Sequence, residues 1–546
     1  MAFLGGALHA PSNYDALAYR LPRILHWLAA GQWQWVHTHF PRLNNRACGI
    51  EWVSAPFISL FRTDRWLFLI NFISFLFLPG LVFSVLTRLG VRRRVAWHWM
   101  WIAPSGYCFL LQAGSISNDA FAAPFSLAAI DFALRAGISK RPVELFWSIL
   151  AAAMLTSAKT SNLPLLLPWA IAILPSLKLL LQRPIATAIV CLMAIFASFL
   201  PTAILNAHFC GDWSGVSLEA DKPHGNVIFR TAANIVLLGV INLNPPVFPE
   251  ADQWNRFVQK ELSKNLNLRL HETLTEPAAA EFQTNQMQAE ENTGLGFGVT
   301  VLLLISAVFA AAHSGKSFLL RFHSADTLWR TGIIIIPWIS TLALLSQSEV
   351  YPVGRLLASY YILLFPLLLV GPEHEGLVKR TWWRFASFIV FALAALLLVI
   401  SPARPLFPVK TFLEKIEAHN PGSKLLARAE EVYAVYRDRN NAFAPALNAL
   451  PPGLKTLGFI TYDDPETSLW RPFGSRRIIH VCPDDSAGCL KAEGVEYILA
   501  KADLFGTQFP GFDVWLAKVN GRLVKKMQLN LRAATGANDW YLIQLN

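Results

Sequence analysis

The chain has 546 residues, of which 54% are hydrophobic and only 15% are charged. Soluble proteins carry about 25% charged residues, so this composition excludes an ordinary soluble enzyme. The formal net charge of +11 could suggest nucleic-acid binding, but the basic residues lie in short clusters between apolar segments, where membrane topology explains them better. We therefore expect no nucleic-acid partner.

Apolar segments near the length of a membrane-spanning helix recur through the first 401 residues. They predict an all-α polytopic membrane protein, with residues 1–401 as its transmembrane domain. The ten predicted spans are 66–87, 96–112, 119–136, 143–158, 163–178, 184–206, 298–313, 331–346, 356–371 and 385–401.

The basic residues predict the orientation of these spans. Loops on one side carry Arg88, Arg92, Arg93, Arg94, Arg135, Lys140, Arg141, Lys178, Arg183, Lys316, Arg321, Arg330, Lys379, Arg380 and Arg384. The short loops on the other side carry only Lys159 and Arg355. Because basic loops stay in the cytoplasm, residues 9–65, 207–297 and the chain from 402 onward are predicted to be exported.

The start of the chain conflicts with this orientation. An exported segment before the first span needs a helix to carry it across, and "MAFLGGAL" is too short to span a bilayer. We interpret it as the end of a first helix that this chain lacks. Translocation of a short N-terminus is the alternative.

The middle exported loop contains "VIFRTAANIVLLGVINL" (227–243), which is nearly apolar enough to span. A crossing there would move every later basic loop outside, so we interpret it as an interfacial helix. Trp254, Phe257, Val258 and Leu262 then recur at helical spacing and indicate an amphipathic helix.

The tail predicts a small α/β domain over residues 402–546. Strand-like runs occur at "LKTLGFITY", "SRRIIHVC" and "GVEYILA", and "AKVNGRLVKK" suggests a hairpin that turns at Asn520 and Gly521. No glycine-rich fingerprint suggests nucleotide binding. Cys482 and Cys489 could form a local disulfide or remain thiols, and the other four cysteines show no metal-ligand spacing.

Four charged residues stand where a predicted span meets the exported face: Asp15, Asp119, Lys159 and Arg355. Charges at a membrane boundary cost free energy and usually serve function or anchoring. Folding could bring these four into one pocket. Two carboxylates with a Lys and an Arg suit a reaction that deprotonates an acceptor while a phosphate leaves.

Four short motifs carry a family resemblance: "YDALAYRLPRILHWL", "SISNDAF", "SAKTSNLP" and "GRLLASYYILLFP". In order and spacing, over roughly residues 9–400, they resemble segments of the bacterial GT-C glycosyltransferases, relatives of the protein O-mannosyltransferases and the lipid A aminoarabinose transferases. The resemblance implies an inverting glycosyltransferase of the bacterial inner membrane that works on the periplasmic side. Its donor would be a polyprenyl-phosphate sugar, and its acceptor a lipid, a glycan or a protein.

The resemblance also implies a role for each site residue. Asp15 would be the base that activates the acceptor, and Asp119 would position the acceptor or bind a metal. Lys159 and Arg355 would hold the lipid phosphate. Arg20 and Arg23 are further candidates for that phosphate, Glu51 is a candidate supporting acid, and metal dependence varies between branches of the superfamily.

This sequence departs from the family's pattern at two positions beside Asp15. Arg20 stands where His is usual, and Ala16 follows Asp15 where the protein mannosyltransferases carry a second acid. The second departure weakens the case for a protein acceptor.

Each site residue also has a structural interpretation. Asp15 and Asp119 could cap the helices that follow them, Lys159 could extend to the interface, and Arg355 could anchor to membrane lipid. His26, His37 and His39 could bind a metal, but histidines beside tryptophans at an interface are more often structural.

Two other functional classes fit a polytopic chain. A transporter or flippase of lipid-linked saccharide would be expected to contain internal repeats and broken helices at the membrane midplane, and we find no repeat. A non-catalytic scaffold subunit would not need four charged residues at one face. Both comparisons favour an enzyme that works at the membrane surface.

Overall fold

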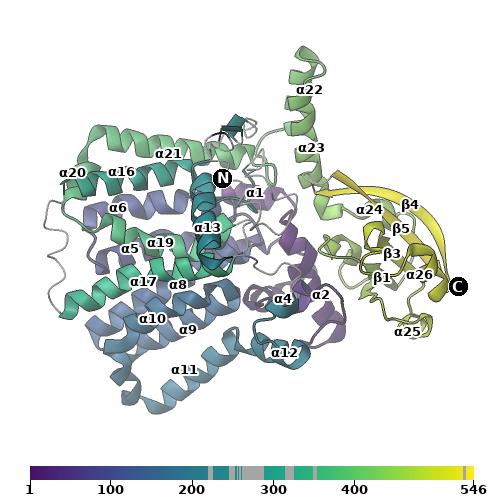
Figure 1. The fold of residues 1–546 in the computed structure, drawn as a ribbon, viewed down its shortest axis with the longest axis horizontal. Coiled ribbons are helices and arrows are strands. Elements are labelled where there is room, and N and C mark those ends of the chain that lie inside the picture. The colour runs from purple at the N-terminus through teal and green to yellow at the C-terminus, as the bar shows by residue number, and fades with distance from the viewer. Residues whose placement is uncertain are drawn as a thin grey trace.

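Long apolar helices lie side by side through the first 400 residues, and a smaller sheet domain lies beyond one end of this bundle (Figure 1). This computed structural model describes residues 1–218, 226–244, 253–254, 256–257, 260, 288–313, 325–348, 353–532 and 536–546. The predicted fold class, a polytopic helical protein with a C-terminal α/β domain, is confirmed.

Five helical segments of the described residues are long and apolar enough to cross a membrane. They are α5 (Phe68–Arg88), α8 (Asn118–Ser139), the stretch Thr160–Gln182 that includes α10 (Leu166–Ile173), most of α17 (Ala325–Gln347), and α21 (Thr381–Ile400). Two bent pairs raise the number to seven: α11 (Pro184–Ala197) with α12 (Leu200–Cys210), and α19 (Ala358–Leu369) with α20 (Glu373–Lys379). The sequence predicted ten.

The remaining three predicted spans do form helices, but shorter ones. α9 (Pro142–Ala158) and α16 (Phe297–His313) have 17 residues each, about three fewer than a perpendicular crossing needs. The segment 96–112 is divided into α6 (Arg93–Ile102) and α7 (Tyr107–Leu110) by a turn that contains Pro104. Proline lacks the amide hydrogen that a continuous helix would use.

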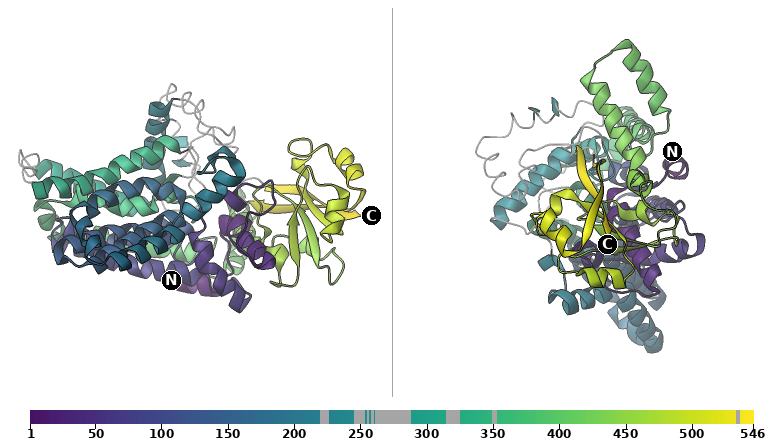
Figure 2. Two further views of the ribbon diagram at one scale, coloured as in Figure 1. Left: turned by 90° about the horizontal axis from the view of Figure 1, so that it is seen from below. Right: turned by 90° about the vertical axis from the view of Figure 1, so that its right-hand side faces the viewer.

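The segment before the first long helix forms a layer between the bundle and the sheet domain (Figure 2, left). It consists of α1 (Ala2–Leu8), a π-helical turn η1 (Ala16–Arg20), α2 (Leu21–Ala30), α3 (Arg42–Asn45) and α4 (Gly49–Phe61). The layer therefore contacts both parts of the molecule.

The apolar face of α2 packs on protein and not on the membrane surface. Ile24 and Leu25 belong to one hydrophobic cluster with Phe459, Trp470 and Trp540 of the C-terminal domain. Because these side chains are buried by the sheet, the amphipathic stripe joins two parts of the chain.

The apolar segment of the middle loop forms α13 (Val227–Asn242), which has 16 residues and falls below the length of a crossing helix. Its side chains bind the end of α17: Arg230 Nε donates to the carbonyl of Ser346 at 3.0 Å, and Asn234 Nδ2 donates to that of Leu345 at 2.7 Å. Of the amphipathic helix predicted after it, Val258 and Leu262 lie outside the described residues.

The C-terminal part begins with a pair of helices, α22 (Val409–His419) and α23 (Lys424–Asp438), which project from the junction (Figure 1), followed by α24 (Ala444–Leu447). A five-stranded sheet then forms in the order β2-β1-β3-β5-β4. Its strands are β1 (Thr456–Ile460), β2 (Arg477–His480), β3 (Tyr497–Lys501), β4 (Gly521–Arg532) and β5 (Gly536–Leu545). β1 pairs in parallel with β2 and β3, whereas β5 is antiparallel to β3 and β4.

Successive side chains of each strand point to opposite faces of this sheet, and both faces are buried. Phe459, Leu499 and Leu542 point to the cluster shared with α2, whereas Ile460 and Ile498 belong to a second cluster. That second cluster also contains Trp515 of α26 (Phe512–Lys518), and α25 (Ala487–Ala492) contributes Leu490 to it. The three strands predicted at 454–500 are confirmed.

The predicted hairpin is wrong in its position. Residues Phe512–Lys518 form α26, which buries Trp515, and Asn520 adopts a positive φ of 51° between this helix and β4. Asparagine tolerates that conformation, so the Asn-Gly pair ends a helix here. Cys482 and Cys489 are both free thiols, so the disulfide alternative is not formed.

Candidate functional site

Asp15 lies at the start of η1, close to the end of the bundle. Its side chain makes no capping hydrogen bond; the amide of Ala16 donates instead to Asn13 Oδ1 at 2.9 Å. Asp15 Oδ2 lies 2.8 Å from Arg355 Nη1 and 3.3 Å from Arg20 Nη2, and 16% of the side chain is exposed. Its carboxylate is therefore held by two guanidinium groups and is still accessible.

Asp119 lies in the first turn of α8, and Ser117 caps that helix in its place by accepting the Asp119 amide. One carboxylate oxygen pairs with Lys159 Nζ, and the other lies 3.9 Å from Arg355 Nη1. Lys159 thus contacts a carboxylate and does not extend to solvent, with 17% of its side chain exposed. The capping and interfacial interpretations of these two residues do not account for their contacts.

Arg355, on the short helix α18 (Val353–Leu356), connects the two carboxylates. Arg20 completes the arrangement, since its Nη2 also donates to Asn118 Oδ1 at 2.8 Å, beside Asp119. We call Asp15, Arg20, Asp119, Lys159 and Arg355 the charged cluster. The four residues that the sequence singled out are brought together, as predicted, from segments that lie 40 to more than 300 residues apart.

The charges of the cluster do not cancel. Two carboxylates face three cations, which leaves one excess positive charge at neutral pH. Burial would raise the pKa of Asp15, but the guanidinium groups of Arg355 and Arg20 outweigh it and hold that pKa well below its usual range. Asp15 is therefore ionised at physiological pH.

Arg23 and Glu51 lie outside the cluster and pair with each other at 3.4 Å, both almost fully buried. The Arg23 guanidinium donates to three backbone carbonyls, those of Arg42, Leu43 and Arg46, at 2.7 to 3.0 Å. Its donors are used to hold the turn around α3, so its surroundings do not support the expected contact with a lipid phosphate. Burial raises the pKa of Glu51, and its position supports a structural role.

A second ion-paired layer behind Asp15 was missed from the sequence. Glu291 Oε1 accepts the amide of Tyr14 at 2.7 Å and pairs with Arg439 at 2.9 Å. Its neighbour Glu290 pairs with Arg404. In the sequence, two adjacent acids in a long polar loop look like solvent-exposed surface residues. Only their buried arginine partners, which the structure shows, distinguish them from such residues.

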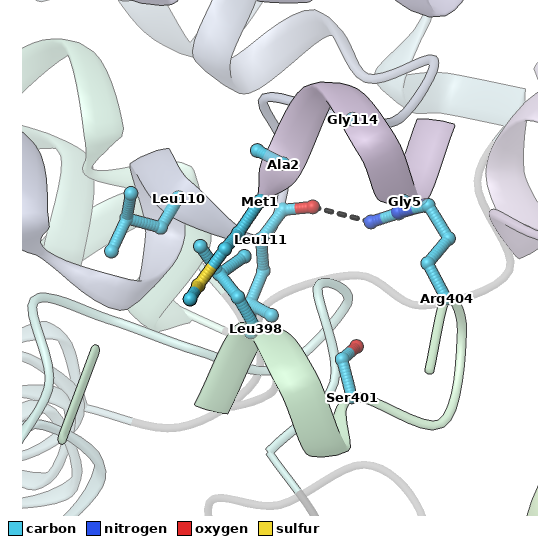
Figure 3. A pocket seen from close by; sticks show the side chains of 9 residues that line it. All are labelled: Met1, Ala2, Gly5, Leu110, Leu111, Gly114, Leu398, Ser401 and Arg404. Carbon is cyan, nitrogen blue, oxygen red and sulfur yellow. Dashed lines mark hydrogen bonds between the residues drawn. The ribbon is translucent and has the colours of Figure 1, made fainter. Parts of the chain in front are cut away.

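Arg404 also approaches the first helix of the chain. Figure 3 presents the small pocket at this point, where Gly5 and Gly114 face the Arg404 side chain and the amide of Gly5 donates to the carbonyl of Met1. A Cβ atom at Gly114 would lie 2.5 Å from the carbonyl of Ala2. The absence of a side chain there permits α1 to pack against the α7–α8 connection.

Metal-binding potential is concentrated elsewhere. Among the described residues, two groups of three candidate ligands lie within reach of one ion: His26, Glu466 and His480; and His37, Cys482 and Asp485. Neither group includes Asp15 or Asp119. In the charged cluster, the position between the two carboxylates is taken by the guanidinium of Arg355.

The chain was compared with known proteins. No family model and no curated protein matches it. Among solved structures, it is similar to ArnT from Cupriavidus metallidurans in the apo state, with 14% identity, a TM-score of 0.41, and coverage of 99% of this chain and 95% of that one. The same enzyme bound to undecaprenyl phosphate gives 13% identity and a TM-score of 0.42 over the same shares.

An archaeal protein is also similar. The Archaeoglobus fulgidus oligosaccharyltransferase, in complex with Zn and sulfate, has 12% identity and a TM-score of 0.43, over 91% of this chain and 65% of that one. These identities and scores are low, so we base the functional proposal on the charged cluster itself.

Proposed function

We propose that this chain is an integral membrane glycosyltransferase that moves a sugar from a polyprenyl-phosphate donor to an acceptor hydroxyl, with inversion at the anomeric carbon. The observation that carries the proposal is the position of Arg355, between two carboxylates in a cluster with one excess positive charge. A phosphodiester carries one negative charge, which that excess would balance. The ordered motifs that resemble GT-C glycosyltransferases support the same reaction.

The residues divide the reaction between them. Asp15 accepts the proton of the acceptor hydroxyl as its oxygen attacks the anomeric carbon. The bond from that carbon to the phosphate oxygen breaks, and its electron pair leaves with the polyprenyl phosphate. Arg355 and Lys159 stabilise the charge that develops on this phosphate, Arg20 adds a third cation, and Asp119 holds Lys159 and Arg355 in place.

The pairing of Asp15 with Arg355 gives the base a means of activation. In the free protein, Arg355 lowers the pKa of Asp15 and makes it a weak base. A donor phosphate would compete for the same guanidinium, and every contact that Arg355 transfers to phosphate raises the pKa of Asp15. Donor binding would thus strengthen the base at the moment when the acceptor needs it.

The proposed setting is the bacterial inner membrane, with the charged cluster and the domain of residues 402–546 in the periplasm. The basic loops support this orientation through the positive-inside rule. Membrane lipids surround the 1–401 domain, and the acceptor is a lipid, a glycan or a protein.

The test compares wild type with Asp15→Asn in membranes supplied with a panel of radiolabelled polyprenyl-phosphate sugars. Asn keeps the size of the side chain and removes the base, so transfer should fall by about 10²- to 10⁴-fold. Asp131→Asn is a matched control, because Asp131 is also buried and paired with two arginines but lies on α8, twelve residues after Asp119 and outside the charged cluster. Equal transfer by wild type and Asp15→Asn would remove Asp15 from catalysis, and no transfer from any donor would contradict the proposed activity.

A further inference from the structure

A second polar cluster lies where the layer that precedes α5 meets the sheet domain, apart from the charged cluster. His26 projects from α2, Glu466 from the 3₁₀ turn η10 (Glu466–Trp470), and His480 from the end of β2. His26 is 10% exposed, and the other two side chains are 1% exposed or less. Three ionisable groups are thus enclosed where two parts of the chain meet.

The three side chains present their ligand atoms to one point. His26 Nε2 lies 3.1 Å from Glu466 Oε1, and His480 Nε2 lies 2.7 Å from Glu466 Oε2. Each imidazole therefore faces a different oxygen of one carboxylate. Ligand atoms bound about 2.0–2.2 Å from a tetrahedral zinc ion lie about 3.3–3.6 Å apart, so the imidazole nitrogens would move away from the carboxylate by less than about 1 Å to admit the ion.

An outer layer of hydrogen bonds fixes the orientation of these groups. His480 Nδ1 lies 2.7 Å from Thr38 Oγ1, and Trp470 Nε1 donates to Glu466 Oε1 at 2.6 Å. Metal-bound histidines usually donate their second ring nitrogen to an oxygen in this manner. The contact with Thr38 leaves the Nε2 lone pair of His480 available for a metal.

We propose that His26, Glu466 and His480 form a structural site for one zinc ion, with the carboxylate as a bidentate ligand. Imidazole and carboxylate ligands suit zinc. The ion would join α2 to the C-terminal domain. The site lies close to η1, the turn that follows Asp15, since Thr467, next to Glu466, donates to the carbonyl of Leu17 in η1 at 2.8 Å. The site is separate from the charged cluster and does not depend on the proposed activity.

The same three residues could form a metal-free hydrogen-bond network, and glutamine variants separate the two interpretations. The amide of His480→Gln or His26→Gln can still donate to Glu466, so a metal-free network would persist, but an amide binds zinc poorly. His37→Gln is the matched control, because His37 belongs to the neighbouring group with Cys482 and Asp485 and is 70% exposed.

The first measurement is the metal content of the purified full-length protein in detergent, as isolated and after incubation with zinc sulfate, by inductively coupled plasma mass spectrometry. We expect about one zinc per chain in wild type and His37→Gln, and a drop of fivefold or more in His26→Gln and His480→Gln. No zinc in wild type under either condition would overturn the proposal. So would equal zinc in wild type and His480→Gln, or loss of zinc in His37→Gln alone.

A second measurement on wild type keeps the test independent of variant folding. Zinc K-edge absorption spectroscopy distinguishes nitrogen and oxygen ligands from sulfur, which binds zinc at about 2.3 Å. The proposed site contains no sulfur, whereas the neighbouring group contains Cys482. A spectrum fitted by nitrogen and oxygen alone supports the proposal, and a zinc–sulfur shell overturns it.

Discussion

Arg355→Gln is the substitution that most directly tests the electrostatics of the charged cluster. It removes the guanidinium that lies 2.8 Å from Asp15 and 3.9 Å from Asp119. At an effective dielectric constant near 20, a charge pair at the shorter distance has a Coulomb energy of about 6 kcal/mol. Desolvation opposes this energy, and removing one partner of a buried pair costs about 3–5 kcal/mol in measured cases. Because Asp15 keeps Arg20 and Asp119 keeps Lys159, we expect the lower end of that range.

The variant also changes the pH dependence of transfer. Asp15 must be ionised to act as a base, and Arg355 lowers its pKa. Without Arg355, the carboxylate binds a proton at higher pH, so the acid limb of the pH–rate profile moves to higher pH. Ionised Asp15 also contributes to the stability of the fold, and this contribution is lost as pH falls through the pKa of Asp15 in the folded state. Because that pKa is higher in Arg355→Gln, the loss begins at a higher pH than in wild type. Loss of one phosphate-binding group should reduce transfer at the optimum about 10²- to 10³-fold.

The assay is transfer from the polyprenyl-phosphate donor found with wild type, followed from pH 4 to pH 9 for Arg355→Gln and Arg355→Lys. Lysine keeps the positive charge but loses the two-pronged contact with phosphate, so its acid limb should move less while its transfer still falls. An Arg355→Gln protein with the wild-type acid limb and transfer within about threefold of wild type would refute the reasoning, since Arg355 would then bind neither the base nor the phosphate.

Three further predictions concern stability, measured as thermal unfolding of the purified protein in detergent. Glu291→Gln should destabilise by about 3 kcal/mol, because it leaves the guanidinium of Arg439 buried without a carboxylate; an unchanged midpoint would mean that water replaces the pair. Trp540→Ala should cost about 3–5 kcal/mol, because the indole is fully buried and stacks on Phe459, and a cost below about 1 kcal/mol would contradict that packing. Gly49→Ala should destabilise by about 1–3 kcal/mol, since its Cβ would lie 2.4 Å from Ser157 Oγ. The matched Gly80→Ala has open space and should be neutral or slightly stabilising, so equal effects of the two would contradict the close packing at Gly49.

The sequence was informative where one physical rule dominates. Asp15, Asp119, Lys159 and Arg355 each interrupt apolar sequence near the face that the sequence predicts to be exported, and the cost of placing a charge there made each of them conspicuous. Arg23 also lies in an apolar stripe, but its partners are backbone carbonyls of residues 42–46. Every residue has a backbone carbonyl, so these contacts cannot be recognised from the residue types in the sequence. The sequence therefore could not distinguish Arg23 from a ligand of phosphate.

Other errors came from local signals that tertiary packing overrides. An Asn-Gly pair favours a hairpin turn, yet burial of Trp515 makes the residues before it helical. Three of the ten predicted spans form helices shorter than a typical crossing helix, namely α9, α16 and the divided pair α6 and α7, because hydropathy registers apolar character but not where a helix begins and ends. Glu290 and Glu291 were missed because their partners Arg404 and Arg439 lie more than 110 residues away.

The C-terminal part helps to build the proposed active site, although it follows Asp15 by about 400 residues. Four hydrogen bonds between it and residues 11–17 hold the chain on both sides of Asp15, at 2.6 to 2.8 Å. Three are donated by the C-terminal part: Asn440 Nδ2 to the carbonyl of Pro11, Arg439 Nη1 to that of Ser12, and Thr467 Oγ1 to that of Leu17. The fourth is donated by Tyr14 Oη to the carbonyl of Asp463. Nearly all of these contacts use backbone groups of the first loop, so they fix where the turn lies and leave the Asp15 carboxylate to Arg355 and Arg20. A base must stay within a fraction of an ångström of its productive position to remain effective. The C-terminal domain is therefore best understood as part of the scaffold that positions the base.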